Sequence, residues 1–285
     1  MTIRTAVWLA IVLPVWGCHR QITGTATNRA PTKDGYQLVW ADEFDKDGWP
    51  DSANWTYENG FVRNQELQWY QPGNARCQMG LLVIEARKEE KANPIYEAGS
   101  RDWRKSRAKI EYTSSCLITA GRHAWQYGRF EMRARIGTAN GMWPAWWTLG
   151  VEKGWPGNGE VDIMEYYRGK LLANIACLGS NRKAEWYSNA FNTDSLGGDA
   201  WASRFHTWQM DWTEEFIALY CDGQLLNKVE VDKLINKDGS GFNPFRQKHY
   251  MLLNLAMGGM NGGDISGTGF PQKFEIDYVR VYQKK

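Results

Sequence analysis

The stretch that decides the fold is Gly128-Arg129-Phe130-Glu131-Met132-Arg133-Ala134-Arg135-Ile136, in which apolar and charged side chains alternate. Successive side chains of a β-strand point to opposite faces, so this period of two predicts a strand with one buried face and one solvated face. The face predicted to be buried carries Phe130, Met132, Ala134 and Ile136.

Similar runs recur along most of the chain. They predict strands over residues 81–87, 143–149, 160–166, 217–221, 224–229, 250–257 and 274–282. Asp222-Gly223, between two of these runs, is a strong signal for a two-residue hairpin turn. The best helical pattern is short, at residues 231–235. Many short strands separated by turns predict an all-β fold, a sandwich or jelly roll, with a single domain over residues 35–285.

The composition excludes some classes of protein and favours others. The 34 Lys and Arg and 32 Asp and Glu leave a formal net charge of +2 on 285 residues, which argues against a nucleic-acid partner. The chain carries 16 Trp, 13 Tyr and 10 Phe, more indoles than a core of this size requires. We therefore expect some aromatic side chains on a surface that stacks against a flat ligand.

The first 34 residues resemble a secretory signal followed by a flexible tether. Residues 1–18 contain Arg4, a short apolar run and then Gly17-Cys18, which is the layout of a secretory signal. Residues 15–18 resemble a bacterial lipobox, in which Cys18 is acylated, although Trp16 departs from the pattern and ordinary cleavage is the alternative. Residues 19–34 are small and polar, as in a flexible tether. We expect an exported monomer, held at a bacterial cell envelope only through a lipid on Cys18, or else secreted.

Four further cysteines, Cys77, Cys116, Cys177 and Cys221, are not spaced as zinc ligands are. In an exported chain they allow two disulfides in three possible pairings, or they stay free and buried. The sequence does not choose between these alternatives.

Three carboxyl groups lie close together in the strand predicted at residues 160–166. Glu160 and Asp162 share one face, with their Cα atoms roughly 6.6 Å apart. Strict alternation would turn Glu165 into the core, where an unpaired carboxylate is very costly. One extra residue, a β-bulge near Ile163 or Met164, returns Glu165 to the face of the other two. The sequence therefore predicts three acids lining one cleft.

Crowded carboxyl groups cannot all ionise easily, so at least one of their pKa values rises. The result is a carboxylate beside a carboxylic acid at neutral pH, the pair that a glycosidase uses. A calcium site or a solvated acidic edge is the alternative, but the flanking residues are apolar and aromatic. No Gly-x-Ser-x-Gly motif indicates a serine hydrolase.

The run Glu160-Val161-Asp162-Ile163-Met164-Glu165 resembles the active-site signature of glycoside hydrolase family 16, in its bulged laminarinase-like form. Other stretches resemble the family in the same order over about residues 36–283, and they are residues 40–44, 64–68, 82–87, 127–131, 143–147 and 277–282. The resemblance implies a β-jelly roll of two curved antiparallel sheets, with a polysaccharide or oligosaccharide chain bound in the concave cleft.

By the same resemblance, Glu160 is the nucleophile and Glu165 is the general acid and then the general base. Asp162 assists by a hydrogen bond to Glu160. Catalysis of this kind implies no cofactor.

The resemblance also implies residues that bind the substrate. Glu131 and Arg133 match positions that point into the cleft, where Arg133 would steady Glu160 or a sugar hydroxyl. A cross-strand salt bridge is the alternative for Arg133. Asn64 and Glu66 match a loop at the cleft edge. The candidate sugar platforms are Trp143, Trp147 and Trp155, and because Trp146 and Trp147 alternate, only one of that pair faces the cleft.

Members of this family often hold a structural calcium ion far from the active site. The matching positions are Glu43, the backbone of Gly80, and Asp277. Oxygen ligands of this kind suit calcium, whereas a salt bridge from Asp277 is the alternative.

Two departures from the family bear on the substrate. The strand expected at residues 173–179 lacks the usual histidine, and residues 96–107 form a basic, aromatic segment like an insertion. We expect a retaining, endo-acting β-glycoside hydrolase that cleaves β-1,3- or mixed β-1,3-1,4-glucan. The alternatives are an endo-β-1,4-galactosidase acting on mucin-type O-glycans, keratan or another galactose-containing chain, and a carbohydrate-binding lipoprotein without activity.

Overall fold

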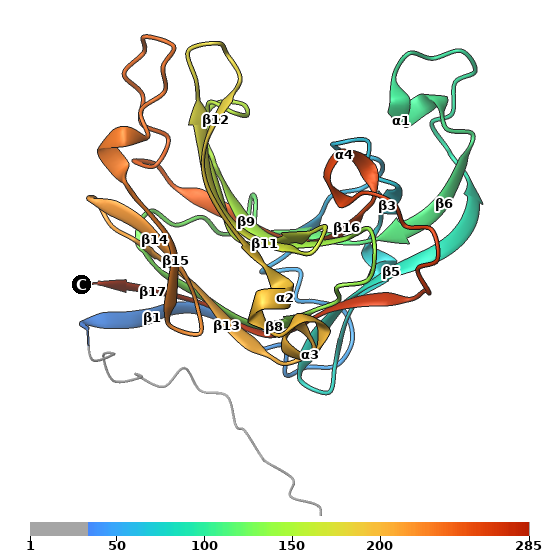
Figure 1. The fold of residues 1–285 in the computed structure, drawn as a ribbon, viewed down its shortest axis with the longest axis horizontal. Helices are drawn as coiled ribbons and strands as arrows, with labels where there is room; N and C mark the ends of the chain where they lie inside the picture. The colour runs from blue at the N-terminus through green and yellow to red at the C-terminus, as the bar shows by residue number, and fades with distance from the viewer. Residues whose placement is uncertain (1–33, 285) are drawn as a thin grey trace, which may run out of the picture. The chain divides into compact units, whose positions relative to one another are not determined.

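Two stacked β-sheets make up the part of the chain that the computed structural model describes, residues 34–284 (Figure 1). The sequence predictions for Cys18, for the signal over residues 1–18 and for nearly all of the tether lie outside this range. Among the described residues, no helix is long and apolar enough to span a bilayer.

The first sheet, here called the inner sheet, is antiparallel throughout. Its order is β12 (Ala184–Asn192), β11 (Lys170–Leu178), β10 (Glu160–Tyr167), β9 (Met142–Gly150), β16 (His249–Met257), β7 (Cys116–Ile118) and β2 (Thr56–Tyr57).

The second sheet, the outer sheet, runs in the order β15 (Gln224–Glu230), β14 (Phe216–Cys221), β13 (His206–Trp212), β8 (Gly128–Ile136), β17 (Gln272–Lys284), β5 (Leu81–Ala92), β6 (Lys109–Ser114) and β3 (Gln68–Tyr70). In addition, β1 (Tyr36–Asp42) pairs with β17, and β4 (Ala75–Gln78) pairs with β5. Its pairs are antiparallel except for β3 with β6. The prediction of an all-β sandwich of two antiparallel sheets is confirmed, with this one parallel exception.

Helical structure among the described residues is confined to single turns. They are α1 (Trp103–Ser106), α2 (Thr193–Leu196), α3 (Gly198–Ala202), α4 (Gly259–Gly262), and the 3-10 turns η1 (Pro72–Asn74) and η2 (Val231–Lys233). The helix expected at residues 231–235 is therefore only a 3-10 turn. The predicted hairpin is present, with Cys221 paired to Gln224 across Asp222 and Gly223.

The hydrophobic core lies between the two sheets. Phe130, Met132 and Ala134 of β8 are fully buried there, as the alternating pattern predicts. Much of the aromatic content also lies in this core, including Trp146 and Trp208. The four cysteines are free and buried, so the disulfide alternative is wrong for them.

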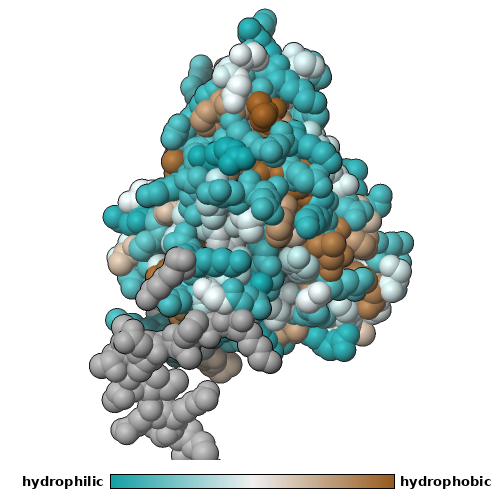
Figure 2. Space-filling model, turned by 90° about the vertical axis from the view of Figure 1, so that its left-hand side faces the viewer, coloured by the Kyte–Doolittle hydropathy of each residue, from teal (hydrophilic) through white to brown (hydrophobic). Residues whose placement is uncertain are grey.

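The inner sheet presents its other face to a cleft. In Figure 1, β11 and β12 rise on one side of this face, and β5, β6 and α1 rise on the other. Figure 2 views the side of the molecule that lies at the left of Figure 1, and hydrophilic residues cover most of it, with hydrophobic residues in small separate groups. The cleft of the inner sheet is where the predicted acids lie.

Candidate active site

A β-bulge in β10 sets the direction of the acidic side chains. On the β9 side, Asp162 pairs with Trp147 and Met164 with Trp146, so that Ile163 is an extra residue. Both Ile163 and Met164 are fully buried. The predicted bulge is therefore present, and it returns Glu165 to the side of the sheet that carries Glu160 and Asp162.

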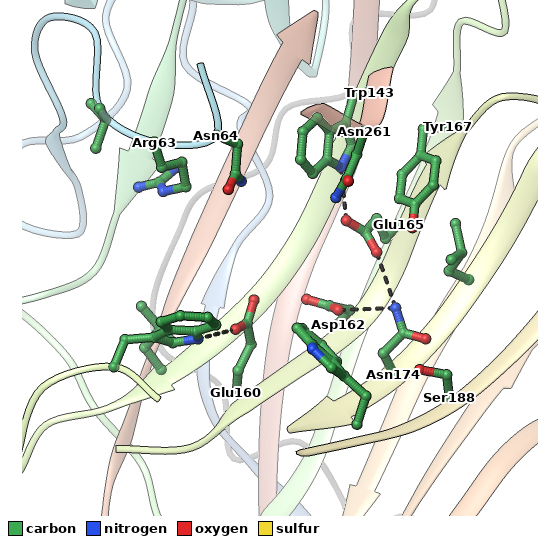
Figure 3. Close-up of a pocket in the computed structure, with 15 residues that line it drawn as sticks. Arg63, Asn64, Trp143, Glu160, Asp162, Glu165, Tyr167, Asn174, Ser188 and Asn261 are labelled. Carbon is green, nitrogen blue, oxygen red and sulfur yellow. Dashed lines mark hydrogen bonds between the residues drawn. The ribbon is translucent and has the colours of Figure 1, made fainter. Parts of the chain in front are cut away.

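These three acids lie on the floor of a cleft of about 790 Å³ (Figure 3). Of the other predicted residues, Asn64, Trp143 and Trp155 line it as well. Further lining residues that the sequence reasoning did not find include Arg63, Tyr167, Asn174, Trp186, Ser188 and Asn261.

Glu160 lies at one end of the acidic group, where its carboxyl group accepts a hydrogen bond from the indole Nε1 of Trp155. Burial raises the pKa of Glu160, while the hydrogen bonds from Trp155 and Asp162 and the positive charge of Arg63 oppose that rise. Each of these opposing contacts favours the ionised form. Glu160 is the acid in the group that is best suited to be a carboxylate.

Glu165 has the opposite tendency. Burial raises its pKa to about 8, with the negative charge of Glu160 acting in the same direction. Its two carboxyl oxygens accept hydrogen bonds from Trp143 Nε1 at 2.8 Å and from Asn174 Nδ2 at 3.1 Å, and both bonds oppose the rise. A group with this pKa is protonated at neutral pH.

Asp162 lies between the two glutamates and is 4% exposed. Burial raises its pKa well above the usual value, and the charges of Glu165 and Glu160 add to the effect. The hydrogen bond that Asp162 donates to Glu160 also raises the pKa of Asp162 and lowers that of Glu160, while Asp162 Oδ2 accepts a hydrogen bond from Asn174 Nδ2 at 3.1 Å. Asp162 therefore separates the two glutamates and favours its own protonated form and the ionised form of Glu160.

Trp147 and Trp146 point to opposite sides of β9, as alternation requires. Trp146 is fully buried in the core between the sheets. Trp147 faces the cleft side, but it is only 7% exposed, because the guanidinium of Arg63 lies 5.0 Å from its ring centroid. Its Nε1 donates to Asn254 at 2.7 Å. Trp147 therefore supports the cleft floor, and it does not offer an open face to a sugar.

The exposed indoles of the cleft are Trp155, at 56%, and Trp186, at 45%. Trp143 is only 5% exposed, and it contacts the acidic group through the indole N–H that it donates to Glu165. Glu66 is also buried below the rim, where it accepts hydrogen bonds from Gln68 and Tyr70. Of the two predicted loop residues, Asn64 lines the large cleft, whereas Glu66 lines a small pocket of about 40 Å³ together with the three acids.

Glu131 and Arg133 do not point into the cleft, and the prediction that they do is wrong. They lie on β8 in the outer sheet, where the apolar side chains of the strand fill the core and the charged ones point away from it. Arg133 forms a cross-strand ion pair with Asp277, and Glu131 accepts a hydrogen bond from Tyr278 at 2.9 Å. The salt-bridge alternative is the correct one.

The residues proposed for calcium do not fit a calcium ion. Glu43 accepts hydrogen bonds from Arg280 at 2.8 and 2.7 Å, and Asp277 is paired with Arg133. Gly80 lies in the turn between β4 and β5. Each carboxylate already has a guanidinium as its partner, and a neighbouring guanidinium repels a divalent cation. These ion pairs link elements of the outer sheet instead.

Four of the six residues missed by sequence reasoning come from strands whose pairing a sequence does not reveal: Tyr167 of β10, Asn174 of β11, and Trp186 and Ser188 of β12. The other two are Arg63, in the loop before β3, and Asn261, in α4. Asp162, Asn174 and Ser188 occupy matched positions on β10, β11 and β12. Trp186, two residues before Ser188, shares its face. The only available signal was their strand alternation, and without the register it could not place them beside the acids.

A carboxylate and a carboxylic acid held together on the floor of a cleft, in an all-β sandwich, define a glycoside hydrolase. A comparison with family models then identifies the particular group: residues 64–280 match the model described as "Glycosyl hydrolases family 16". The chain belongs to this family, and it is a glycoside hydrolase that needs no cofactor for catalysis.

Known proteins of this family resemble the chain over most of its length. "Beta-glucanase" from Rhodothermus marinus is 34% identical, with 98% of this chain and 94% of that protein covered. A solved structure from work on endo-acting O-glycanases, expressed by prominent members of the human gut microbiota to initiate mucin breakdown, has a TM-score of 0.81 and 33% identity, covering 90% and 94% of the two chains. A mutant of SCLam, a non-specific endo-β-1,3(4)-glucanase, gives a TM-score of 0.70 and 35% identity, covering 90% and 98%.

Proposed function

We propose that the protein is a retaining, endo-acting β-glycoside hydrolase whose substrate is a β-1,3- or mixed β-1,3-1,4-glucan. The observation that carries the mechanism is the bulge in β10, because it places two glutamates of unlike proton affinity on one side of the strand. The glucan substrate is supported by the resemblance to the Rhodothermus marinus beta-glucanase and to SCLam.

In the first step, the Glu160 carboxylate attacks the anomeric carbon and forms a covalent glycosyl-enzyme. Glu165 gives its proton to the leaving glycosidic oxygen at the same time, so that the departing chain leaves as a neutral alcohol. In the second step, Glu165 as a carboxylate takes a proton from water, which attacks the anomeric carbon and releases Glu160. The configuration at the anomeric carbon is therefore retained.

The neighbouring groups match these roles. Trp155 and Asp162 donate hydrogen bonds to Glu160 and favour the carboxylate that attacks. The burial of Glu165 keeps its proton available at neutral pH. A protein that only binds sugar gains nothing from two crowded acids, so this arrangement favours the enzyme over the carbohydrate-binding alternative.

A galactose-containing chain, such as a mucin-type O-glycan, is the second candidate substrate. The observation in its favour is the TM-score of 0.81 with the structure from the study of O-glycanases, against 0.70 for SCLam. Strand β11 also has no histidine, and the segment before β6 adds α1 at one side of the cleft. Both features bear on the shape of the cleft, and neither alters the three catalytic acids.

Product analysis tests these proposals. The protein is incubated with laminarin, mixed-linkage β-glucan, keratan and mucin O-glycans, and the products are sized. We expect internal cleavage into oligosaccharides, and proton NMR of the first products should show the retained β-anomer. Glu160→Gln should reduce turnover by a factor of at least about 10³. Release of single sugars from chain ends, or an inverted anomer, would contradict the mechanism.

We also propose that the enzyme acts as a monomer, as a single domain over residues 35–285, held at a bacterial cell envelope by a lipid on Cys18. The support is the pattern of residues 1–18 and the polar tether that follows. Labelled palmitate should enter the protein in bacterial cells, and Cys18→Ser should abolish labelling and release the protein from membranes. Equal labelling of both forms would rule out this anchor.

A further inference from the structure

Asn174 lies beside Asp162 and Glu165, and the mechanism above gives it no task. It is on β11, directly across from Asp162 of β10 and from Ser188 of β12. Its side chain lines the cleft and is 4% exposed (Figure 3). An asparagine amide provides two N–H donors and one carbonyl acceptor, so each of these can be accounted for separately.

The two donors of Asn174 are both used. Its Nδ2 donates to Asp162 Oδ2 at 3.1 Å and to Glu165 Oε2 at 3.1 Å. These carboxyl groups are three residues apart across the bulge, which is the irregular part of the strand. One rigid amide therefore fixes the assisting acid and the proton donor relative to each other.

The carbonyl oxygen of Asn174 has no hydrogen-bond partner, although it is buried. An unpaired buried carbonyl oxygen is costly, so its presence in a cleft points to a ligand that donates a hydrogen bond to it. A carbonyl oxygen accepts but cannot donate, so the missing partner is an O–H or N–H group. A sugar bound at the acids offers such a group, as a hydroxyl or an acetamido N–H.

We infer that Asn174 is a positioning residue that also binds the substrate: its amide nitrogen holds Asp162 and Glu165, and its carbonyl oxygen accepts a hydrogen bond from a hydroxyl or acetamido group of the sugar at the cleavage site. The role of the carbonyl oxygen in binding the sugar rests on the proposed function. The role of the amide nitrogen in holding Asp162 and Glu165 concerns the free protein and does not depend on the substrate.

Two substitutions separate the positioning role of Asn174 from its role in sugar binding. Asn174→Leu keeps the size of the side chain and removes both donors and the acceptor. Asn174→Asp removes the amide donors and keeps an oxygen where the carbonyl was. Asn189→Leu is the matched control, because Asn189 lies on β12 opposite Ala173, on the other face of the sheet, and bonds the backbone oxygen of Leu226. Thermal midpoints of all four proteins report whether each variant folds.

The free protein tests the positioning role without turnover. With ¹³C-labelled glutamate carboxyls, NMR gives the titration midpoint of Glu165. In Asn174→Leu the midpoint should rise by about one pH unit, because a donor to the carboxylate is lost, and in Asn189→Leu it should not move. An unchanged midpoint in folded Asn174→Leu overturns the positioning role, whether or not the protein hydrolyses any glycan.

Sugar binding is measured in the background of Glu160→Gln, which cannot turn over. Calorimetry with laminarin oligosaccharides and with mucin O-glycans gives the affinity. Adding Asn174→Leu should weaken binding about tenfold or more, and adding Asn174→Asp should weaken it less. Equal affinity with and without Asn174→Leu overturns the role of the carbonyl. Glu160→Gln that binds neither glycan class counts against the proposed substrates and also against a sugar partner for this oxygen.

Discussion

Glu160 and Glu165 are chemically identical side chains whose surroundings give them different roles. Glu165 is buried and Glu160 is partly buried, and burial raises the pKa of each. Glu160 has hydrogen bonds from Trp155 and Asp162 and the field of Arg63 to favour its ionised form. Glu165 has the charge of Glu160 nearby and a pKa of about 8. The difference comes from neighbouring donors and charges, and it provides a base and an acid at one pH.

The pH dependence of activity follows from this difference. Because Glu165 must be protonated to act as an acid, kcat/KM should fall as pH rises through about 8, which is the pKa of this group. Trp143→Phe removes a donor that stabilises the carboxylate, so the pKa of Glu165 rises and the alkaline limb should move up by about one pH unit. The measurement is the pH profile of kcat/KM on a soluble glucan.

Trp147→Phe is the control for that shift, because the Trp147 indole bonds Asn254 and not an acid of the group. Its alkaline limb should coincide with that of the wild type. A limb that does not move in Trp143→Phe would mean that the titrating group is not Glu165.

At the scale of elements, the segment between β5 and β6 supports the opposite wall of the cleft. Arg107, just after α1, donates to the backbone oxygens of Glu66 at 2.6 Å and Gln65 at 2.9 Å. Its guanidinium also lies 4.7 Å from the ring centroid of Phe61 and 4.8 Å from that of Trp103. Asn64 and Gln65 both have φ of +52°, which is unusual for residues with a side chain. The segment that departs from the family therefore holds a strained loop of the active site.

Removing this support should weaken substrate binding more than it slows the chemical step. In Arg107→Ala we expect unfolding free energy to fall by about 1–2 kcal/mol and KM to rise severalfold, with a smaller change in kcat. Arg104→Ala is the control, because Arg104 is exposed and pairs only with Asp102 in the same segment. Denaturant unfolding and steady-state kinetics on both variants make the comparison, and equal effects from the two would refute a specific role for Arg107.

At the scale of the whole molecule, the core between the sheets holds the fold without covalent links in residues 34–284. The four cysteines there are free, and burial raises the pKa of Cys77 to about 12 and of Cys177 to about 11. The pKa values of Cys116 and Cys221 are raised in the same way. Since the thiolate is the reactive form, these thiols are inert while the protein is folded.

Reductant should therefore leave the stability unchanged. In a Cys18→Ser variant, the thermal midpoint should be the same with and without dithiothreitol, to within about 1 °C, because a native disulfide would contribute about 2–4 kcal/mol. A thiol reagent should label four cysteines only after unfolding. A midpoint that drops by several degrees in reductant would contradict the free thiols.

The sequence by itself determined the fold class, the strands that carry the acids and the bulge that turns Glu165. Each of these follows from local information: alternation assigns faces, and an acid that would otherwise be buried in the core requires an irregular strand. The sequence could not determine the contacts that depend on which strands are neighbours in a sheet.

Only the tertiary structure decided that Glu131 and Arg133 lie in the outer sheet, that the cysteines stay apart, and that Asn174 and Trp186 join the cleft. The physical reason is that alternation says which side chains share a face but not what that face packs against. Strand order and register are set by contacts between residues far apart in the chain, and a shift of one residue would exchange the two faces of a strand.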